Sequence, residues 1–372
     1  MLLKGIKILD LSNLIPGPMC SMILASLGAY VIKIESMQGD PLRNFEKVKG
    51  KSPYFEALNR GKKSVAINLK TEEGKKILRK LILNSDVFLE SFRPGKMDSL
   101  EFGYSEVKKL NPKIIYCSIS GYGQTGKDKN KAGHDLNFLS SSGMLAMISD
   151  KSFVPGVQIA DTSSALFAAI SIIASLFSRE RSNKGNYVDV SMMSSAISMM
   201  AAQVAFASCS SRKQILSGCA CYNIYQTKDK KFVSLCAIEP RFWKAFYNAT
   251  NNQNLIKKQF DSSNSTINSM QKLFKSKNLA YWKSMNSKYD FCCEPVMDIK
   301  TALKENQSKK LLERNGIFLL PKIPMGFSNF RTSSNRKSPK IGQHTKKILI
   351  ELRYSNDKIK TLAIEGVILS SR

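Results

Sequence analysis

The sequence predicts an α/β fold in which helices cover a parallel sheet, together with a second, smaller domain. An apolar-rich strand at residues 6–11 is followed by Pro16-Gly17-Pro18, which turns the chain into a helix, and then by a strand at 31–34. Strands and helices continue to alternate, and such βαβ units imply parallel pairing. Near residue 210 the composition becomes polar and Asn-rich, which predicts the smaller domain.

The elements follow one another in a regular order. The first helix carries apolar residues at helical spacing up to Leu27, and Gly28 ends it. The large domain is predicted to continue with strands at 63–69, 87–90, 113–120 and 187–191, and with helices at 71–84, 104–110, 161–181 and 194–207. We expect a large domain over 1–205, a linker over 206–225, a small domain over 226–320, a second linker over 321–340 and C-terminal helices within 341–372.

Composition narrows the class of protein. The 372 residues carry a formal net charge of +28. Because the lysines are spread along the whole chain, we expect a basic surface that attracts polyanionic small molecules, and no specific nucleic-acid interface. The longest apolar run, 165–177, is too short for a membrane span, and the N-terminus lacks the pattern of a signal peptide. We therefore expect a cytoplasmic enzyme with no membrane span.

The cysteines do not indicate a metal site or a disulfide framework. The chain has eight cysteines and two histidines. Cys219-x-Cys221 and Cys292-Cys293 lack the spacing typical of zinc pairs. We expect reduced cysteines that pack as small apolar residues, and no bound metal.

A glycine motif imitates a dinucleotide site. Residues 121–126 match G-x-G-x-x-G and follow a strand. A dinucleotide fingerprint opens a helix, whereas this motif runs into the charged segment 127–131 and occurs late in the sheet. The glycines are better explained by a sharp turn or by close approach of the backbone to a ligand.

Three residues are candidates for proton transfer. His134 lies between a loop and an apolar helix at 136–147, where it either caps the helix or serves as a base. Asp161 stands where a helix N-cap is favoured; burial at that junction would also raise its pKa and make it a usable acid or base. Glu239 directly follows a strand, either as a surface residue or as the group that orients a catalytic histidine.

Taken in order, these segments resemble the class III CoA transferase (CaiB/BaiF) family, and within it the α-methylacyl-CoA racemase branch. The similarity extends from Gly5 to about Gly366 and is thin between roughly 245 and 315. The motifs that carry it are Pro16-Gly17-Pro18, Asn59-Arg60-Gly61-Lys62-Lys63-Ser64, Phe92-Arg93-Pro94-Gly95, the segment 120–126, Gly133-His134-Asp135, Ala160-Asp161 and Ala237-Ile238-Glu239-Pro240.

The resemblance implies an architecture and a ligand. It implies a Rossmann-like large domain completed by the C-terminal segment, a smaller α+β domain, and an interlocked homodimer whose sites form between the large domain of one chain and the small domain of the other. It implies an acyl-CoA substrate and no separate cofactor, since CoA arrives as the substrate thioester. By position, the coenzyme contacts would fall on Ile67, Asn68, Leu69, Lys70, Ser91, Phe92, Arg93, Gly133, Asp135, Leu136, Asn137 and Phe138.

The family contains two chemistries that share Asp161. In transferases the corresponding Asp is a nucleophile that forms an acyl-enzyme, and in racemases it is one of two bases that flank the α-carbon. His134 stands where racemases carry the other base, and Glu239 stands where they carry the carboxylate that orients it. The chain also has no glycine run like the loop that shields transferase intermediates. The resemblance therefore favours a racemase, with a CoA transferase as the alternative.

Some positions depart from the racemase pattern. Ser36 and Ser99 stand where racemases usually have arginines that meet the CoA phosphates. Lys33, Arg43 and Lys96 lie near enough in sequence to be considered as replacements. Residues 162–164 read Thr-Ser-Ser in place of an aromatic residue and glycines, which alters the expected acyl pocket.

Overall fold

The structure is a computed structural model that describes all residues except 149–153, 212–213, 215, 217, 331–336 and 371–372. By their internal contacts, the described residues divide into a large unit, Met1–Ala201 with Lys310–Arg372, and a small unit, Ala202–Lys309. Both linkers expected from the sequence contain residues outside the described part of the chain, at 212–213, 215 and 217 and at 331–336.

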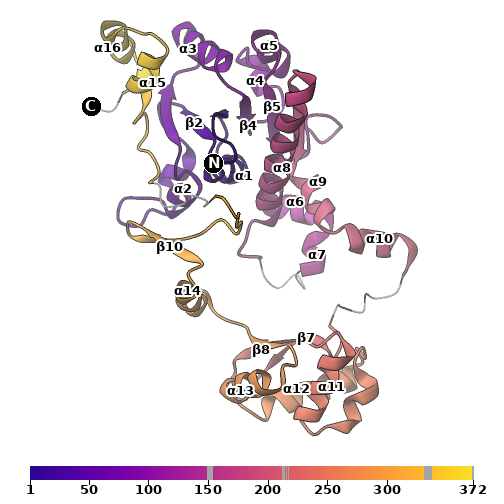
Figure 1. The fold of residues 1–372 in the computed structure, drawn as a ribbon. Coiled ribbons are helices and arrows are strands. Elements are labelled where there is room, and N and C mark those ends of the chain that lie inside the picture. The colour runs from indigo at the N-terminus through magenta and orange to yellow at the C-terminus, as the bar shows by residue number, and fades with distance from the viewer. Residues whose placement is uncertain (149–153, 212–213, 215, 217, 331–336, 371–372) are drawn as a thin grey trace. The chain divides into compact units, whose positions relative to one another are not determined.

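The large unit contains a seven-stranded, mainly parallel sheet (Figure 1). Its strands are β1 (Lys7–Asp10), β2 (Tyr30–Glu35), β3 (Lys63–Ile67), β4 (Val87–Glu90), β5 (Ile115–Ser120), β6 (Asn186–Ser191) and β12 (Ile368–Leu369). The strand order is β12-β3-β2-β1-β4-β5-β6, and only β12 pairs in the antiparallel sense. The six parallel strands therefore have the order 3-2-1-4-5-6 of Rossmann folds, which confirms the predicted α/β class.

Helices cover both faces of this sheet (Figure 1). The helices of the large unit are α1 (Pro16–Ser26), α2 (Pro53–Leu58), α3 (Glu72–Leu83), α4 (Lys96–Ser99), α5 (Tyr104–Leu110), α6 (Asp135–Ser142), α7 (Met144–Ile148), α8 (Ile159–Ser182), α9 (Met192–Met199), α15 (Thr345–Glu351) and α16 (Asn356–Ile364), with a 3-10 turn at Pro41–Asn44. The unit also holds a hairpin of β10 (Leu312–Asn315) and β11 (Phe318–Pro321).

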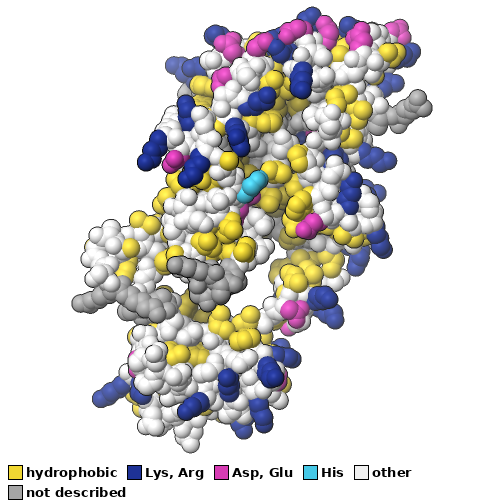
Figure 2. All heavy atoms as spheres, turned by 180° about the vertical axis from the view of Figure 1, so that it is seen from behind, with side chains coloured by type: hydrophobic (Ala, Val, Ile, Leu, Met, Phe, Trp, Pro, Cys, Tyr) yellow, Lys and Arg dark blue, Asp and Glu magenta, His cyan; other side chains and the backbone are white. Residues whose placement is uncertain are grey.

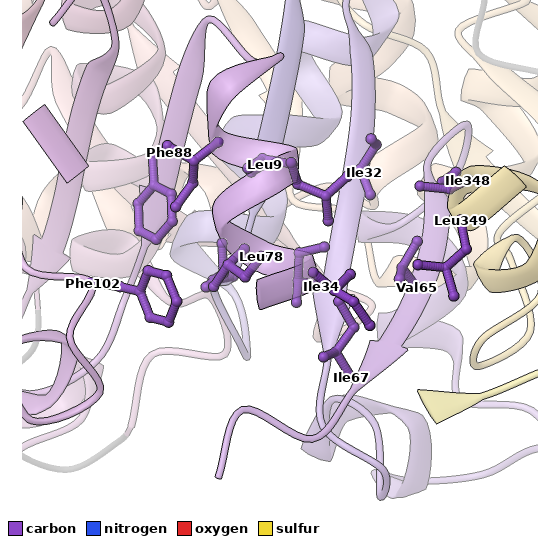
Figure 3. Close-up of a cluster of buried hydrophobic side chains, with 14 of the residues drawn as sticks. Leu9, Ile32, Ile34, Val65, Ile67, Leu78, Phe88, Phe102, Ile348 and Leu349 are labelled. Atoms are coloured by element: carbon purple, nitrogen blue, oxygen red, sulfur yellow. The ribbon is translucent and has the colours of Figure 1, made fainter. Parts of the chain in front are cut away.

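Alternation along each strand divides the core between the two faces. Leu9 and Phe88 belong to a buried cluster with side chains of α3, α5, α15 and α16, part of which Figure 3 shows, while the adjacent Ile8 and Val87 belong to a second cluster on the other face with side chains of α1 and α8. Because successive strand side chains point to opposite faces, strands buried on both sides are apolar at nearly every position.

Two predicted helices differ from those observed. The helix expected at 136–147 is two helices, α6 and α7, because Gly143 takes a left-handed conformation with φ +82° and ends α6. The helix expected at 194–207 is also divided, into α9 and α10 (Ala201–Cys209), which bend by 71°.

Helix α8 is longer than the apolar run expected at its position. Its 24 residues have the length and the mean hydropathy, 1.7, of a membrane span, although the apolar run alone is too short for one. Half of its most apolar segment is buried within the large unit, and the helix packs against α1 and α9. Core helices of globular proteins share these properties, so the sequence alone does not distinguish the two cases.

The small unit has its own core. It contains β7 (Tyr222–Gln226), β8 (Phe232–Cys236) and β9 (Cys293–Pro295) in an antiparallel sheet, together with α11 (Pro240–Ala249), a 3-10 turn at Gln253–Lys258, α12 (Asn264–Lys275), α13 (Leu279–Tyr289) and α14 (Ile299–Ser308). Trp243, Phe246, Phe274 and Trp282 form the centre of that core, each at most 2% exposed.

Candidate active site

The strand order places a crevice beside β1. Strand β2, which follows β1 in the chain, pairs with one side of β1, and β4 pairs with the other side. The connections that follow β1 and β4 therefore run in opposite directions from the carboxyl ends of these two strands. In open α/β sheets, ligands bind at this switch point. The residues after the two strands are tied together there, because the backbone N–H of Asn13 donates to the hydroxyl of Ser91 at 3.0 Å.

Two cavities open at these strand ends, and Asn13 and Phe92 line both of them. The first cavity has a volume of about 410 Å³ and brings His134 and Asp161 together. The second has a volume of about 450 Å³ and lies over the ends of β2 and β3. The candidate proton-transfer residues and a candidate coenzyme-binding space therefore adjoin within the large unit.

Asp161 is the third residue of α8, and not its N-cap as the sequence suggests; Gln158 holds the N-cap position. The Asp161 side chain is partly buried and reaches the first cavity. Burial, with the nearby Asp135 carboxylate as the second cause, raises the pKa of Asp161 to about 7. A carboxyl group with this pKa can both release and accept a proton near neutral pH.

His134 is the N-cap residue of α6, and its backbone N–H donates to Oδ1 of Asn137 at 3.0 Å. This bond holds the start of α6 in place. The His134 side chain is exposed and lines the first cavity.

Glu239 belongs to the small unit, where it is the exposed N-cap residue of α11. His134 and Asp161, by contrast, belong to the large unit.

Most of the predicted coenzyme contacts line a cavity. Ile67, Asn68, Leu69 and Lys70 line the second; Ser91, Arg93, Gly133, Asn137 and Phe138 line the first; Phe92 lines both. Asp135 and Leu136 line neither: the Asp135 carboxylate accepts from the backbone of α8, and Leu136 is 39% exposed.

The glycine motif at 121–126 makes room for a neighbouring side chain and does not form the turn of a dinucleotide site. Residues 121–134 contain no helix, which agrees with the interpretation against a dinucleotide fingerprint. A side chain at Gly121 or Gly133 would place its Cβ within 2.8 Å of the Phe138 ring. These two glycines therefore make room for Phe138 at the floor of the first cavity.

Two of the three proposed replacements for the missing arginines are wrong. Lys33 is fully buried in an ion pair with Asp40, with 2.9 Å between Nζ and Oδ2, and Arg43 is bound to Glu35 at 2.7 Å. Lys33 is inaccessible to solvent, and the partly exposed Arg43 is held by Glu35 and does not line the second cavity. Lys96, by contrast, lines the second cavity together with Ser36 and Lys70. Among the described residues, neither Lys96 nor Lys70 forms an ion pair.

Beneath the crevice lies a buried ionic network that sequence reasoning missed. Lys62 donates to Asp10 at 2.9 Å, to Asn59 at 2.8 Å and to the carbonyl of Pro18, and every side chain of this group is inaccessible to solvent. The Asp10 carboxylate also accepts from the backbone and hydroxyl of Ser12, so it shapes the turn that leads to Asn13. The sequence signals were an acid at the end of an apolar strand and two motifs of the family resemblance, which contain Pro18, Asn59 and Lys62.

The surface charges and the cysteines can be located in the structure. Figure 2 shows Lys and Arg side chains scattered over the face that it displays, without a single concentrated patch. Within the described part of the chain, no cluster of three or more His, Cys, Asp or Glu side chains has the arrangement of a metal site, and the eight cysteines are unpaired.

Comparisons with known proteins identify a family and a fold. The family model described as CoA-transferase family III matches residues 3–345. Succinyl-CoA:glutarate CoA-transferase of Mus musculus is 31% identical, covering 98% of this chain and 90% of its own length. Alpha-methylacyl-CoA racemase of Homo sapiens is 30% identical, covering 100% and 99%. The crystal structure of a CAIB/BAIF family protein from Brucella suis has a TM-score of 0.81 at 26% identity, covering 94% of this chain and 99% of that one.

Proposed function

The chain belongs to CoA-transferase family III, and on that basis we propose that it is an α-methylacyl-CoA racemase, which inverts the α-carbon of a 2-methyl-branched acyl-CoA. The observation that carries this proposal is the shared cavity of His134 and Asp161, in which Asp161 has a pKa of about 7. Racemisation by two bases needs one group protonated and the other free, and it needs the roles to exchange for the opposite enantiomer. An acid of this strength suits that exchange.

The chemical steps follow from the two side chains. One group removes the α-proton, and the conjugate acid of the other delivers a proton to the opposite face. The thioester makes the first step possible because the negative charge moves onto its oxygen as an enolate. The backbone N–H groups of Asp135 and Leu136 lie at the start of α6, where a helix offers no internal acceptor, and these are suited to stabilise that oxygen.

Coenzyme binding is assigned to the second cavity. Lys70 and Lys96 both line it, and we propose that they meet the CoA phosphates in place of the arginines that Ser36 and Ser99 replace. Lysine acts as a flexible point charge and lacks the planar fork of arginine, so the phosphate contact would be less directional.

A homodimer completes the proposed site. Leu166, Ile170, Ile173 and Phe177 occur every three to four residues along α8 and are 37–62% exposed, so they form one apolar face. We propose that a second copy covers this face in the interlocked arrangement expected from the family, and that Glu239 of the second copy's small unit orients His134. A cytoplasmic location, and a large and a small domain joined by two linkers, are part of the same proposal.

The alternative is a CoA transferase in which Asp161 is the nucleophile. It is favoured by the transferase relatives, whose identity to this chain equals that of the racemase. A nucleophilic carboxylate must be ionised, however, and a pKa of about 7 leaves much of Asp161 protonated at neutral pH. This burial suits an acid–base role better than a nucleophilic one.

Deuterium exchange separates the two chemistries. The protein is incubated in D₂O with a panel of 2-methyl-branched acyl-CoAs and no acceptor acid, and the α-carbon is examined by mass spectrometry. A racemase incorporates deuterium, and His134→Ala and Asp161→Ala abolish the incorporation. His344→Asn is the matched control, because His344 is the other histidine and lies at the start of α15.

The opposite result supports the alternative. If wild type incorporates no deuterium but forms an acyl-enzyme that hydroxylamine traps when an acceptor acid is present, the protein is a transferase. Loss of that trapped species in Asp161→Ala would assign the nucleophile.

A further inference from the structure

Helix α8 begins without a cap of its own. The first backbone N–H groups of a helix have no partner within the helix, and the residue before it usually supplies one. Gln158 occupies that position in α8, but its side chain makes no capping hydrogen bond. The backbone N–H of Asp161 instead donates to Oδ1 of Asp135 at 3.0 Å. A carboxylate from another helix therefore caps α8 at the residue proposed to move the proton.

Asp135 also belongs to the other half of the site. It is the first residue of α6 and directly follows His134. Its carboxylate points to α8, and it lines neither cavity. One side chain therefore joins the start of the helix that carries His134 to the start of the helix that carries Asp161.

Few other charges surround this contact. Among the described residues, Asp135 forms no ion pair, and α9, which packs against both α6 and α8, contains no acidic or basic side chain. Helix α1, which packs against α8, contributes only the buried thiol of Cys20. The titratable groups that face Asp161 are thus Asp135 and, across the cavity, His134, Arg93, Lys129 and Lys131.

We propose that Asp135 is a positioning residue for the reaction: by capping α8 it fixes Asp161 toward the cavity, and by its negative charge it favours the protonated form of Asp161. This inference rests on the proposed function at one point, namely that Asp161 exchanges the substrate proton. Burial raises the pKa of Asp135 itself, while its bonds to the α8 backbone oppose that rise, so the helix N-terminus stabilises the charge.

Two substitutions separate the two effects. Asp135→Asn keeps the oxygen that caps α8 and removes the charge, whereas Asp135→Ala removes both. Asp357→Asn is the matched control for the charge change, because the side chain of Asp357 is 93% exposed in α16. All three variants are first compared with wild type by circular dichroism.

The charge effect is measured by proton binding and not by activity. The number of protons bound is measured as a function of pH for wild type and for Asp161→Asn, and the difference between the two curves gives the titration of Asp161. The same difference is then measured in proteins that carry Asp135→Asn or Asp357→Asn, each with and without Asp161→Asn. We expect the Asp161 midpoint to move to lower pH, by about one pH unit, only in the Asp135→Asn background. An unchanged midpoint there overturns the electrostatic part of the proposal.

The capping effect is measured by the rate of deuterium incorporation. With Asp135→Asn the lower arm of the pH–rate profile moves in the same direction as the titration, while Asp135→Ala loses about tenfold to a hundredfold in rate at its best pH. A full rate in Asp135→Ala overturns the positioning role. Because the titration needs no substrate, a shifted midpoint in a protein without exchange activity would support the electrostatic part of this inference while rejecting the racemase and, with it, the positioning role in that reaction.

Discussion

Replacing Glu90 by Gln should stabilise the large unit above neutral pH. Glu90 is the last residue of β4 and is 3% exposed, and its Oε2 accepts from the backbone N–H of Phe92 at 2.7 Å. Burial raises its pKa to about 7, against an ordinary value of 4.5, and the nearest charged groups that contribute, Asp98 and Asp189, are acids. No described cation compensates the charge of this carboxylate when it ionises.

The magnitude follows from linkage. Because the folded state holds this proton more tightly than the unfolded state, the free energy of unfolding falls as pH rises from about 4.5 through about 7, and is level above that. At about 1.4 kcal/mol per pKa unit, the loss amounts to about 3 kcal/mol by pH 8. Gln is neutral at all pH values and keeps an oxygen for the Phe92 N–H. The variant should therefore gain up to about 3 kcal/mol at pH 8 and little at pH 4.5.

Urea unfolding at pH 4.5 and pH 8 tests this expectation. Far-UV circular dichroism follows the whole chain, while the two tryptophans, Trp243 and Trp282, both lie in the small unit and report its unfolding separately. The tryptophan transition serves as an internal control and should be the same in both proteins. An equal stability of Glu90→Gln and wild type at pH 8, or a gain of the same size at both pH values, would refute the linkage argument.

Three further substitutions test other parts of the structure. Lys62→Met leaves Asp10 buried without its partner, so we expect the free energy of unfolding to fall by about 3–5 kcal/mol in urea titrations; a loss below about 1 kcal/mol would contradict the buried pair. Lys96→Ala should weaken CoA binding in calorimetry and reduce its dependence on salt, whereas the same change at the exposed Lys109 should do neither. Phe177→Asp places a charge on the exposed face of α8, so the dimer proposed here should dissociate at concentrations where wild type associates, as measured by sedimentation.

Local patterns in the sequence were sufficient for the fold class. The alternation of apolar strands with helices, and the Pro-Gly-Pro turn that opens α1, predicted a parallel sheet, because backbone periodicity and turn chemistry depend on neighbours in sequence. Local patterns alone left His134 and Asp161 as capping residues or proton carriers; the family resemblance selected them as a pair, and both line one cavity in the structure. The local patterns placed the start of α8 two residues late, since the cap that an Asp usually supplies comes here from another helix.

Only the tertiary structure decided the environment of each charge. Lys33 and Arg43 looked available for phosphates, but in the folded chain Asp40 binds Lys33, which is fully buried, and Glu35 binds Arg43. The raised pKa of Asp161 depends likewise on burial and on Asp135, which lies 26 positions earlier in the chain. The sequence by itself thus determined the order of strands and helices and the candidates for the reactive groups. Burial and ion pairing join residues that are distant in sequence, and they decided what those groups can do.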